Sequence, residues 1–508
     1  MKICFLLQRR FAYIGHNLAV LLKEKYGITE FCGYVYLRSS YDFLKQQKDI
    51  NYTSLLLDDE IHKLHKNEIL DMAYLKKLES EYGIPNLWPY LAVDRVLMSN
   101  QLVREYPYNK PPYTYEEMLK ILQVQAKAVT NFLEKEKPDF IFFTQAIGGV
   151  GSLLLYNIAK KKGIPILCAT INTLPKTVVL SDNYAYLDGV EKKFAELIQK
   201  PELIKKHINY QKAKTFLSDF QDKPRPYSEI HDRNNYRFDQ LKQLDFLLPK
   251  KILISIKWFL HLIYEYFVSK IRYDYTYTNP IYYLADRIKR KVRGLKRIKY
   301  EKINPDEPYA FFPLQLEPEV SLLLLASWAT DQRHIIKQIA KSLPVGYKLY
   351  VKEHPQMVSY RPMSYYEELK KIPNIILIDP RINSFEVIKH AKLITTITGT
   401  VGWEAILLKK PVITFGDIFY NKIPGVKNCR TMEQLPWLVK EQIENFNYNE
   451  ETLVAYICAV LDDAAQNIDL LQLWERETDE EKKRQNLQPL VDLLAKKMNL
   501  INNNQEKI

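Results

Sequence analysis

Residues Thr398–Ala405 read TGTVGWEA and combine small, hydroxyl and acidic side chains between two apolar runs. Glycines permit a tight turn, and the N–H groups at the start of a helix attract anions. Thr398 and Thr400 can add hydroxyl donors, and Gly399 allows a ligand close to the backbone. Glu404 lies one turn further, where a carboxylate can bind the two hydroxyls of a ribose. The segment predicts a nucleotide phosphate site; the alternative is a capped helix whose glycines serve only packing.

Lys352 and His354 lie in a second candidate segment, Lys-Glu-His-Pro, which follows an apolar run. The proline after His354 fixes the turn and holds the imidazole at the end of the preceding strand. A histidine near a phosphate can donate a hydrogen bond, neutralise charge or act as a general acid to the leaving group. Lys352 can supply electrostatic stabilisation. The alternative is a surface turn in which the histidine only caps the backbone.

Gln315 and Glu317 form a third candidate pair, flanked by prolines after another apolar run. Two prolines and a Gln/Glu pair predict a rigid polar loop directed into a cleft. Glu317 is a candidate for contact with a base or a sugar hydroxyl. We interpret Glu319 as an acid favoured by the dipole at a helix N-terminus.

The elements predicted around these segments put each of them just after a strand. In open α/β sheets ligands bind at the carboxyl ends of strands, so we expect the three segments to meet in one pocket. The predicted strands are Tyr309–Leu314, Tyr347–Lys352, Asn374–Ile378, Lys392–Thr396 and Val412–Phe415, and the predicted helices are Glu319–Ser342, Ser384–His390 and Thr398–Leu408.

The first half of the chain predicts a separate α/β unit. The continuous apolar run Phe140–Thr144 is typical of a parallel strand. Gly148 and Gly149 follow it and are candidate acceptor-side residues. The other elements predicted are strands over Ile3–Gln8, Phe31–Tyr36 and Ile164–Thr170, helices over Ile14–Glu24 and Leu153–Lys162, and a mostly helical stretch from about Ser54 to Glu136.

The predicted fold class is therefore α/β, with two Rossmann-like lobes and a helical, basic insertion between them. We expect an N-terminal lobe over residues 1–195 and an insertion, rich in tyrosine, over 196–305. A C-terminal lobe over 306–433 and C-terminal helices with a polar tail over 434–508 complete the chain. Two such lobes place a ligand cleft between them.

The insertion is amphipathic and strongly basic. Lys257, His261 and Glu265 interrupt the apolar stretch Lys251–Lys270, and the run Asp286–Tyr300 holds eight basic residues against one acid. One interpretation is docking to anionic lipid heads or to a lipid-linked acceptor. The other is a helical insertion packed on the lobes with solvated charges.

The composition is that of an ordinary folded protein, with 508 residues, 47% apolar and 26% charged. A net charge of +13 favours anionic partners, or reflects many surface lysines without a target. No known nucleic-acid module supports a nucleic-acid role. Five scattered cysteines argue against a disulfide framework and a zinc site. Without a signal peptide or a run of about 20 apolar residues, we expect a cytoplasmic protein, peripheral at the inner face of the membrane if the insertion docks there.

The runs FFPLQLEPE, LPVGYKLYVKEHP and NIILIDPRINSFEVIKHAKLITTITGTVGWEAILLKKPVITFGDIFY resemble the capsule polysaccharide biosynthesis family. That family is related to the capsule Kdo transferases. The resemblance is close over about 306–425 and looser over Lys137–Gly189.

The resemblance implies a GT-B fold with the donor nucleotide mainly on the C-terminal lobe. By motif, His354 would contact the donor phosphate, and Gln315 and Glu317 would line the sugar. The residues implied to hold the rest of the donor are Thr398, Gly399 and Thr400 for phosphate and Glu404 for ribose. The related Kdo transferases are similar in using CMP-activated acidic sugars and a carboxylate nucleophile, for which Asp182 of the other lobe is the candidate here.

The function expected is transfer of a sugar from a nucleotide-sugar, such as CMP-activated Kdo, to a glycan or lipid-linked acceptor of a surface polysaccharide. No cofactor and no metal are expected, because Lys352, His354 and a helix N-terminus can neutralise the leaving phosphate. The adjacent acids Asp58 and Asp59 are interpreted as helical and facing solvent. The alternatives are a sugar-nucleotide 2-epimerase and a non-catalytic component of capsule export or assembly.

Overall fold

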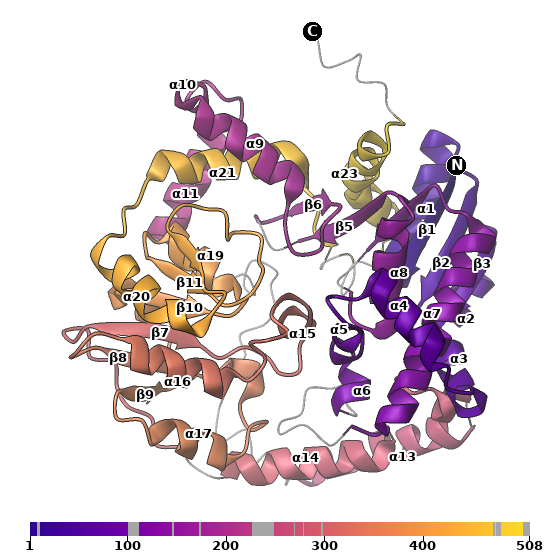
Figure 1. Ribbon diagram of the computed structural model, residues 1–508, viewed down its shortest axis with the longest axis horizontal. Coiled ribbons are helices and arrows are strands. Elements are labelled where there is room, and N and C mark those ends of the chain that lie inside the picture. The colour runs from indigo at the N-terminus through magenta and orange to yellow at the C-terminus, as the bar shows by residue number, and fades with distance from the viewer. Residues whose placement is uncertain are drawn as a thin grey trace.

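The computed structural model describes residues 1–7, 11–99, 111–144, 147–171, 174–225, 248–268, 270–277, 279–295, 298–470, 473 and 479–500. Gln8, residues 296 and 297 of the basic run, and the tail over 501–508 lie outside these ranges. Figure 1 shows two lobes side by side, each built on its own sheet.

The first lobe is built on a seven-stranded sheet with the order β13-β6-β5-β4-β1-β2-β3. Its first five strands in sequence are parallel, whereas β6 and β13 are antiparallel to their neighbours. Strands β1 and β4 are almost wholly buried because helices cover both faces. The strands are β1 (Lys2–Leu7), β2 (Glu30–Val35), β3 (Tyr52–Leu57), β4 (Phe140–Phe143), β5 (Ile166–Thr170), β6 (Thr177–Ser181) and β13 (Ala464–Gln466).

Alternate residues of β1 divide the core of this lobe into two layers. Cys4 and Leu6 face the side covered by α7 and α8, while Ile3, Phe5 and Leu7 face α1 and α23. The helices of the lobe are α1 (Phe11–Tyr26), α2 (Arg38–Gln46), α3 (Asp58–Lys63), η1 (Leu64–Asn67), α4 (Met72–Tyr82), α5 (Trp88–Ala92), α6 (Arg95–Ser99), α7 (Tyr115–Glu136), α8 (Val150–Lys161) and α23 (Glu480–Lys497).

The second lobe has a six-stranded, fully parallel sheet with the order β12-β11-β10-β7-β8-β9. Its first strand, β7, lies beside β10 on one side and β8 on the other, so the strand order reverses between β7 and β10. Ligands of open α/β sheets bind at such a switch point. The strands are β7 (Tyr309–Pro313), β8 (Lys348–Lys352), β9 (Ile375–Ile378), β10 (Leu393–Thr396), β11 (Val412–Thr414) and β12 (Val426–Asn428).

Helices cover both faces of the second sheet as well. Ala310 and Phe312 of β7 face α16, α17 and α20, whereas Tyr309 and Phe311 face the side of α19 and α21. The helices are α15 (Val320–Leu325), α16 (Gln332–Ser342), η4 (Pro355–Met357), α17 (Met363–Lys370), α18 (Ser384–His390), α19 (Thr400–Leu407), η5 (Met432–Gln434), α20 (Leu435–Glu444) and α21 (Glu450–Asp463).

The remaining helices link the lobes. Helices α9 and α11 pack on α21 of the second lobe, while α23 returns to α1 of the first. Along the lower edge of Figure 1, α13 and α14 run beneath both lobes. These elements are α9 (Asp188–Gln199), α10 (Pro201–Ile204), α11 (Tyr210–Asp222), α13 (Pro249–Val268), η3 (Lys270–Tyr273) and α14 (Pro280–Leu295).

The predicted fold class is confirmed: two Rossmann-like α/β lobes, with a helical, basic insertion between them. The exact division at residues 195, 305 and 433 stays a prediction, and packing connects elements on both sides of the first and last boundaries. Among the described residues, no helix is both long and apolar enough to cross a membrane.

Three expectations about elements were wrong. The helical stretch predicted from Ser54 begins inside β3, which pairs with β2. The helix predicted over Glu319–Ser342 is two helices, because α15 ends at Leu325 and α16 starts only after Asp331 caps it. The C-terminal region predicted as helical contains β13, which completes the first sheet through pairing with β6.

Candidate functional site

The loops after β7 and β10 meet at the switch point of the second sheet. The backbone N–H of Thr398 donates to Oε1 of Gln315 at 3.1 Å, and Nε2 of Gln315 lies 3.3 Å from the Thr398 hydroxyl. The end of β8 is next to them, since Pro313 pairs in register with Lys352. The structure therefore brings the three predicted segments to one rim of the sheet.

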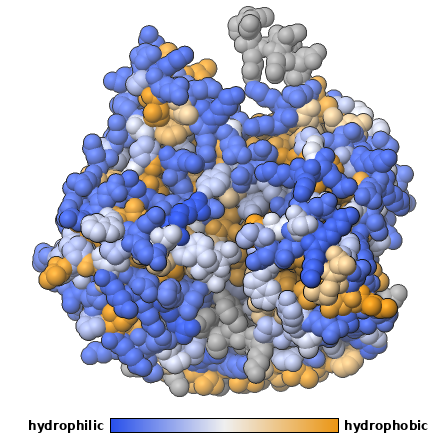
Figure 2. Space-filling view, viewed as in Figure 1, coloured by the Kyte–Doolittle hydropathy of each residue, from blue (hydrophilic) through white to orange (hydrophobic). Residues whose placement is uncertain are grey.

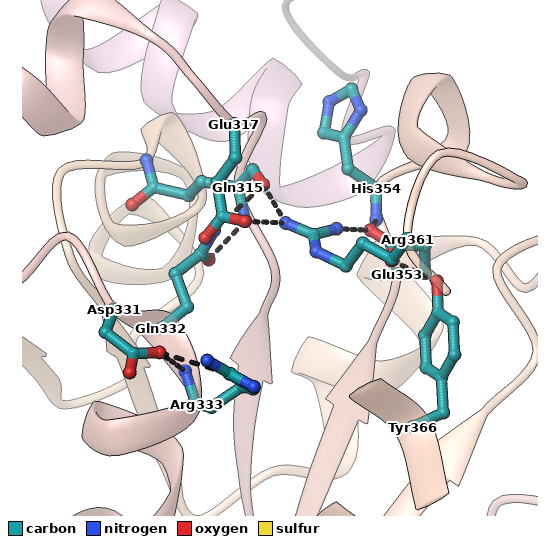
Figure 3. Close-up of polar contacts among 9 residues, drawn as sticks. All are labelled: Gln315, Glu317, Asp331, Gln332, Arg333, Glu353, His354, Arg361 and Tyr366. Carbon is teal, nitrogen blue, oxygen red and sulfur yellow. Dashed lines mark hydrogen bonds and ion pairs between the residues drawn. The ribbon is translucent and has the colours of Figure 1, made fainter. Parts of the chain in front are cut away.

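A buried arginine that sequence reasoning missed ties two of these loops together. Arg361, only 1% exposed, donates through Nη2 to the carbonyl of Gln315 at 2.8 Å and lies 3.3 Å from Oε2 of Glu317. Its other Nη forms an ion pair with Glu353, whose second oxygen accepts from the hydroxyl of Tyr366 at 2.6 Å (Figure 3). The Arg361 network thus fixes the loop after β7 against the loop after β8.

Glu317 belongs to this network. Its side chain is 2% exposed and accepts a hydrogen bond from the amide of Gln332, the first residue of α16. Burial raises the pKa of Glu317, and the guanidinium of Arg361 opposes that rise. Its described contacts stabilise the loop, so the predicted contact of Glu317 with a sugar stays a prediction.

Lys352 is a buried cation at the end of β8. Its ammonium donates to the hydroxyl of Ser384 at 2.8 Å. Burial lowers the pKa of Lys352 to about 8, and the carboxylates of Glu404, Asp379 and Glu353 partly offset this. Among these carboxylates, Glu404 raises the pKa of Lys352 most. The side chains of Lys352 and Glu404 are therefore close enough to interact electrostatically.

His354 is half-buried, and its ring points away from the Arg361 network in Figure 3. The backbone N–H of Gln356 donates to Nδ1 of His354 at 3.2 Å. In the neutral ring the proton therefore sits on Nε2, which makes Nε2 a donor. That orientation suits a hydrogen bond to an anionic ligand.

The three predicted phosphate-binding residues at the start of α19 differ in how far their groups already take part in internal hydrogen bonds. The amide of Thr398 is used by Gln315, and the amide of Gly399 donates to the Thr396 hydroxyl at 3.2 Å. A Cβ at Gly399 would lie 2.7 Å from that hydroxyl oxygen, so the turn needs glycine. Thr400, the first helical residue, is half-exposed. Thr398 and Gly399 shape the turn, and the predicted contact of the half-exposed Thr400 with a phosphate stays a prediction.

The candidate residues of the first lobe lie after β4 and β6. A Cβ at Gly148 would lie 3.1 Å from Val320, so α15 of the second lobe approaches this turn closely. A Cβ at Gly149 would lie 2.8 Å from the ring of Tyr36. Both glycines serve close packing. Asp182 is exposed, and among the described contacts it is linked to Asp188 rather than to the second lobe.

The lobes also meet beside the β11 end of the site. The hydroxyl of Tyr186 donates to Asp417 at 2.5 Å, and Arg430 pairs with the same carboxylate. Together with Gly148 and Val320, this contact places the rim of the second sheet opposite the first lobe.

The interpretation of Asp58 and Asp59 as solvent-facing is wrong. Both are helical, as predicted, because they begin α3 directly after β3, but each is only 1% exposed. Tyr275 donates to Asp58 at 2.5 Å, and the hydroxyl of Thr276 donates to Asp59 at 2.8 Å. Burial, with the Asp274 carboxylate, raises the pKa of Asp59 to about 8. The error arose because the partners that bury these acids lie far away in the sequence.

A cavity of about 300 Å³ lies behind the loops that follow β8 and β9. Its charged lining consists of guanidinium groups from α14 and from the strand ends, beside one carboxylate. The residues concerned are Arg293, Arg361, Arg381 and Asp379. Within the described ranges no cluster of three or more His, Cys, Asp or Glu is arranged to hold a metal ion.

Residues 259–457 match the protein family described as capsule polysaccharide biosynthesis protein. The matched segment covers less than half of the chain. It runs from within α13 into α21 and contains every second-lobe residue discussed above. The resemblance seen in the sequence to capsule polysaccharide biosynthesis proteins is thereby confirmed.

Individual relatives are more distant. Protein FixF of Sinorhizobium fredii (strain NBRC 101917 / NGR234) is 31% identical over 136 residues, which cover 25% of this chain and 31% of FixF. The matched segment thus spans about a third of that relative.

Two solved structures are similar to this chain at a low level. The Thermosulfurimonas dismutans KpsC, beta Kdo 2,7 transferase, is 15% identical, with a TM-score of 0.32, over 72% of this chain and 89% of that chain. The UDP-GlcNAc 2-epimerase from Neisseria meningitidis is 12% identical, with a TM-score of 0.28, over 91% and 98%. Likeness at this level carries no argument about activity.

Proposed function

We propose that the protein is a glycosyltransferase of capsule or surface-polysaccharide biosynthesis that binds its nucleotide-sugar donor on the second lobe. The observation that carries the proposal is the convergence of Gln315, Lys352, His354 and the start of α19 at the switch point. A buried ammonium, an Nε2–H donor and a helix N-terminus together suit a phosphate.

The proposed chemistry uses these groups to stabilise the leaving nucleotide. The oxygen of an acceptor hydroxyl forms the new bond to the sugar and releases its proton to solvent. As the glycosidic bond to the donor phosphate breaks, negative charge builds on the phosphate oxygen. Lys352 and the N–H groups at the start of α19 neutralise that charge, and Nε2 of His354 donates a hydrogen bond to it. Because these donors are held in place by Ser384 and by the backbone of Gln356, they need little reorganisation during the reaction. No metal ion or cofactor is included in this proposal.

The finer parts of the proposal concern the two substrates. The donor is a CMP-activated acidic sugar such as Kdo, bound with its ribose at Glu404 and its sugar near Gln315. The acceptor, a glycan or lipid-linked glycan, enters from the side of the first lobe.

The variant His354→Ala tests the proposal in a transfer assay with a panel of CMP- and UDP-sugars. We expect transfer to fall by about 100-fold or more, the range typical of a lost general acid. His334→Ala, an exposed histidine of α16, is the matched control and keeps full activity. Full activity of the folded His354→Ala protein would overturn the assignment.

The same assay separates the two alternatives. A 2-epimerase would convert the nucleotide-sugar without any acceptor glycan. A non-catalytic assembly component would leave every donor in the panel unchanged.

A further inference from the structure

Helix α13 exposes an apolar stripe that no other described element covers. None of its residues is buried. The spacing of one, three or four residues along the stripe places its members on one side of the helix. They are between 42% and 62% exposed and are Ile252, Leu253, Ile256, Leu260, Tyr264 and Phe267.

Helix α14 continues the same kind of surface. Its exposed aliphatic residues recur every three or four positions and therefore form one stripe. They are between 37% and 67% exposed and are Ile281, Leu284, Ile288, Val292 and Leu295. Figure 2 shows hydrophobic side chains along the lower edge of the molecule, where Figure 1 draws α13 and α14. A contiguous apolar surface of this kind marks an interaction site.

The inward side of the α13–α14 segment, residues 249–295, is attached to both lobes. Arg38 of the first lobe donates to Asp274 at 2.8 Å, and Tyr275 donates to Asp58. At the other end, Arg290 donates to the hydroxyl of Tyr360 in the second lobe at 2.8 Å. These contacts hold the segment in one orientation, so the apolar stripes face outward.

Basic side chains accompany the stripes. Glu265 and Asp286 are the only acids of the two helices, and Asp286 already pairs with Arg290 at 2.6 Å. Two copies of this surface would bring like charges together, whereas lipid phosphates would neutralise them. The basic residues beside the stripes are Lys250, Lys251, Lys257, Arg287, Lys289 and Lys291, whereas Arg290 and Arg293 bond to Tyr360 of the second lobe.

We propose that the α13–α14 segment docks the protein on an anionic lipid bilayer. The apolar stripes enter the boundary between headgroups and acyl chains, and the lysines and arginines at their flanks contact lipid phosphates. This docking is inferred from the geometry of the two helices. It does not depend on the function proposed for the second lobe.

Vesicle flotation of the full chain tests this surface. The wild type binds vesicles of phosphatidylcholine with phosphatidylglycerol, and high salt weakens the binding. The double variant Leu260→Glu/Ile288→Glu lowers the partition coefficient by about tenfold or more, because it places two charges in the apolar boundary. The double variant Lys257→Glu/Lys289→Glu lowers it on the anionic vesicles to a similar degree.

Val345→Glu is the matched control, since Val345 is fully exposed on the second lobe away from these helices. It binds like the wild type, and thermal unfolding confirms that all variants fold. Equal binding by the Leu260→Glu/Ile288→Glu variant, or equal affinity for vesicles of phosphatidylcholine alone, overturns the proposal. So does a concentration-dependent dimer that the same variant abolishes, because the stripes would then be a contact between two copies.

Discussion

At the residue scale, the candidate site combines buried side chains that hold the loops together with side chains that are accessible at the rim of the sheet. Arg361, Glu353 and Glu317 form a buried network, whereas His354 and Thr400 are half-exposed at the rim. Buried ion pairs are costly to form and costlier to break on one side, because the remaining charge loses its partner. The network therefore makes the geometry of the site sensitive to a residue that need not touch substrate.

The variant Arg361→Met tests that role. It leaves two carboxylates, Glu317 and Glu353, without their cation, so we expect the free energy of unfolding to fall by about 3–5 kcal/mol in urea titrations. Arg333→Met is the control, because Arg333 pairs with the partly exposed Glu368 and should cost less than about 1 kcal/mol. Losses of equal size in the two variants would contradict the account.

The lowered pKa of Lys352 predicts a pH dependence. With a pKa of about 8 against an ordinary 10.5, Lys352 loses its proton in the folded protein first. Folding is therefore penalised below about pH 8, and that penalty disappears as the pH rises toward 10.5. Phosphate binding changes in the opposite direction: it weakens as the pH rises, because it needs the protonated ammonium of Lys352.

Calorimetric titration with a nucleotide at pH values from about 7 to about 9.5 measures this effect. The dissociation constant should increase as the pH passes about 8. The variant Lys352→Met should bind weakly at every pH, and Lys348→Met, at the far end of β8, should behave like the wild type. A pH-independent affinity of the wild type would remove Lys352 from the phosphate site.

Residues next to apolar strands could be found from the sequence, and residues defined by distant partners could not. Gln315, Lys352 and Thr398 follow buried runs, and the geometry of parallel sheets brings such positions to one edge. Arg361 lies in a loop, and its partners are visible only after folding. In the sequence Arg361 stands between Tyr360 and Pro362, and an arginine in such surroundings is too common to indicate a buried ion pair.

At the element scale, buried strands and long helices are recognisable because their patterns are local. The runs that form β1, β4 and β7 are apolar almost throughout. Strands β3 and β13 escaped prediction because pairing with a neighbouring strand, rather than side-chain periodicity, defines them. The division of the predicted helix over Glu319–Ser342 likewise depends on tertiary contacts, with Leu323 and Leu324 packing on the first lobe.

The attachment of the α13–α14 segment to the first lobe also belongs to this scale. Tyr275→Phe removes a hydrogen bond to the buried carboxylate of Asp58, so the free energy of unfolding should fall by about 1–3 kcal/mol. Tyr273→Phe, 55% exposed and two residues earlier, should change it by less than about 0.5 kcal/mol. Chemical denaturation of both variants provides the measurement, and unchanged stability of Tyr275→Phe would argue against a firm attachment.

At the scale of the whole molecule, two sheets with the same arrangement of their central strands face each other across the site. The chain passes between the lobes more than once: α9 and α11 pack on the second lobe, and β13 and α23 return to the first. Contacts such as Tyr186 with Asp417 then set how the lobes meet. Two α/β units were visible in the sequence, but these exchanges were not, because they join segments hundreds of residues apart.

Hydrogen exchange can show whether the loops after β7, β8 and β10 form one nucleotide pocket, as we propose. The exchange of backbone amides is compared with and without a saturating CMP- or UDP-sugar. Residues 313–319, 352–361 and 396–404 should become protected together, since one ligand orders all three loops. Protection confined to other parts of the chain, or to one of these loops alone, would contradict it.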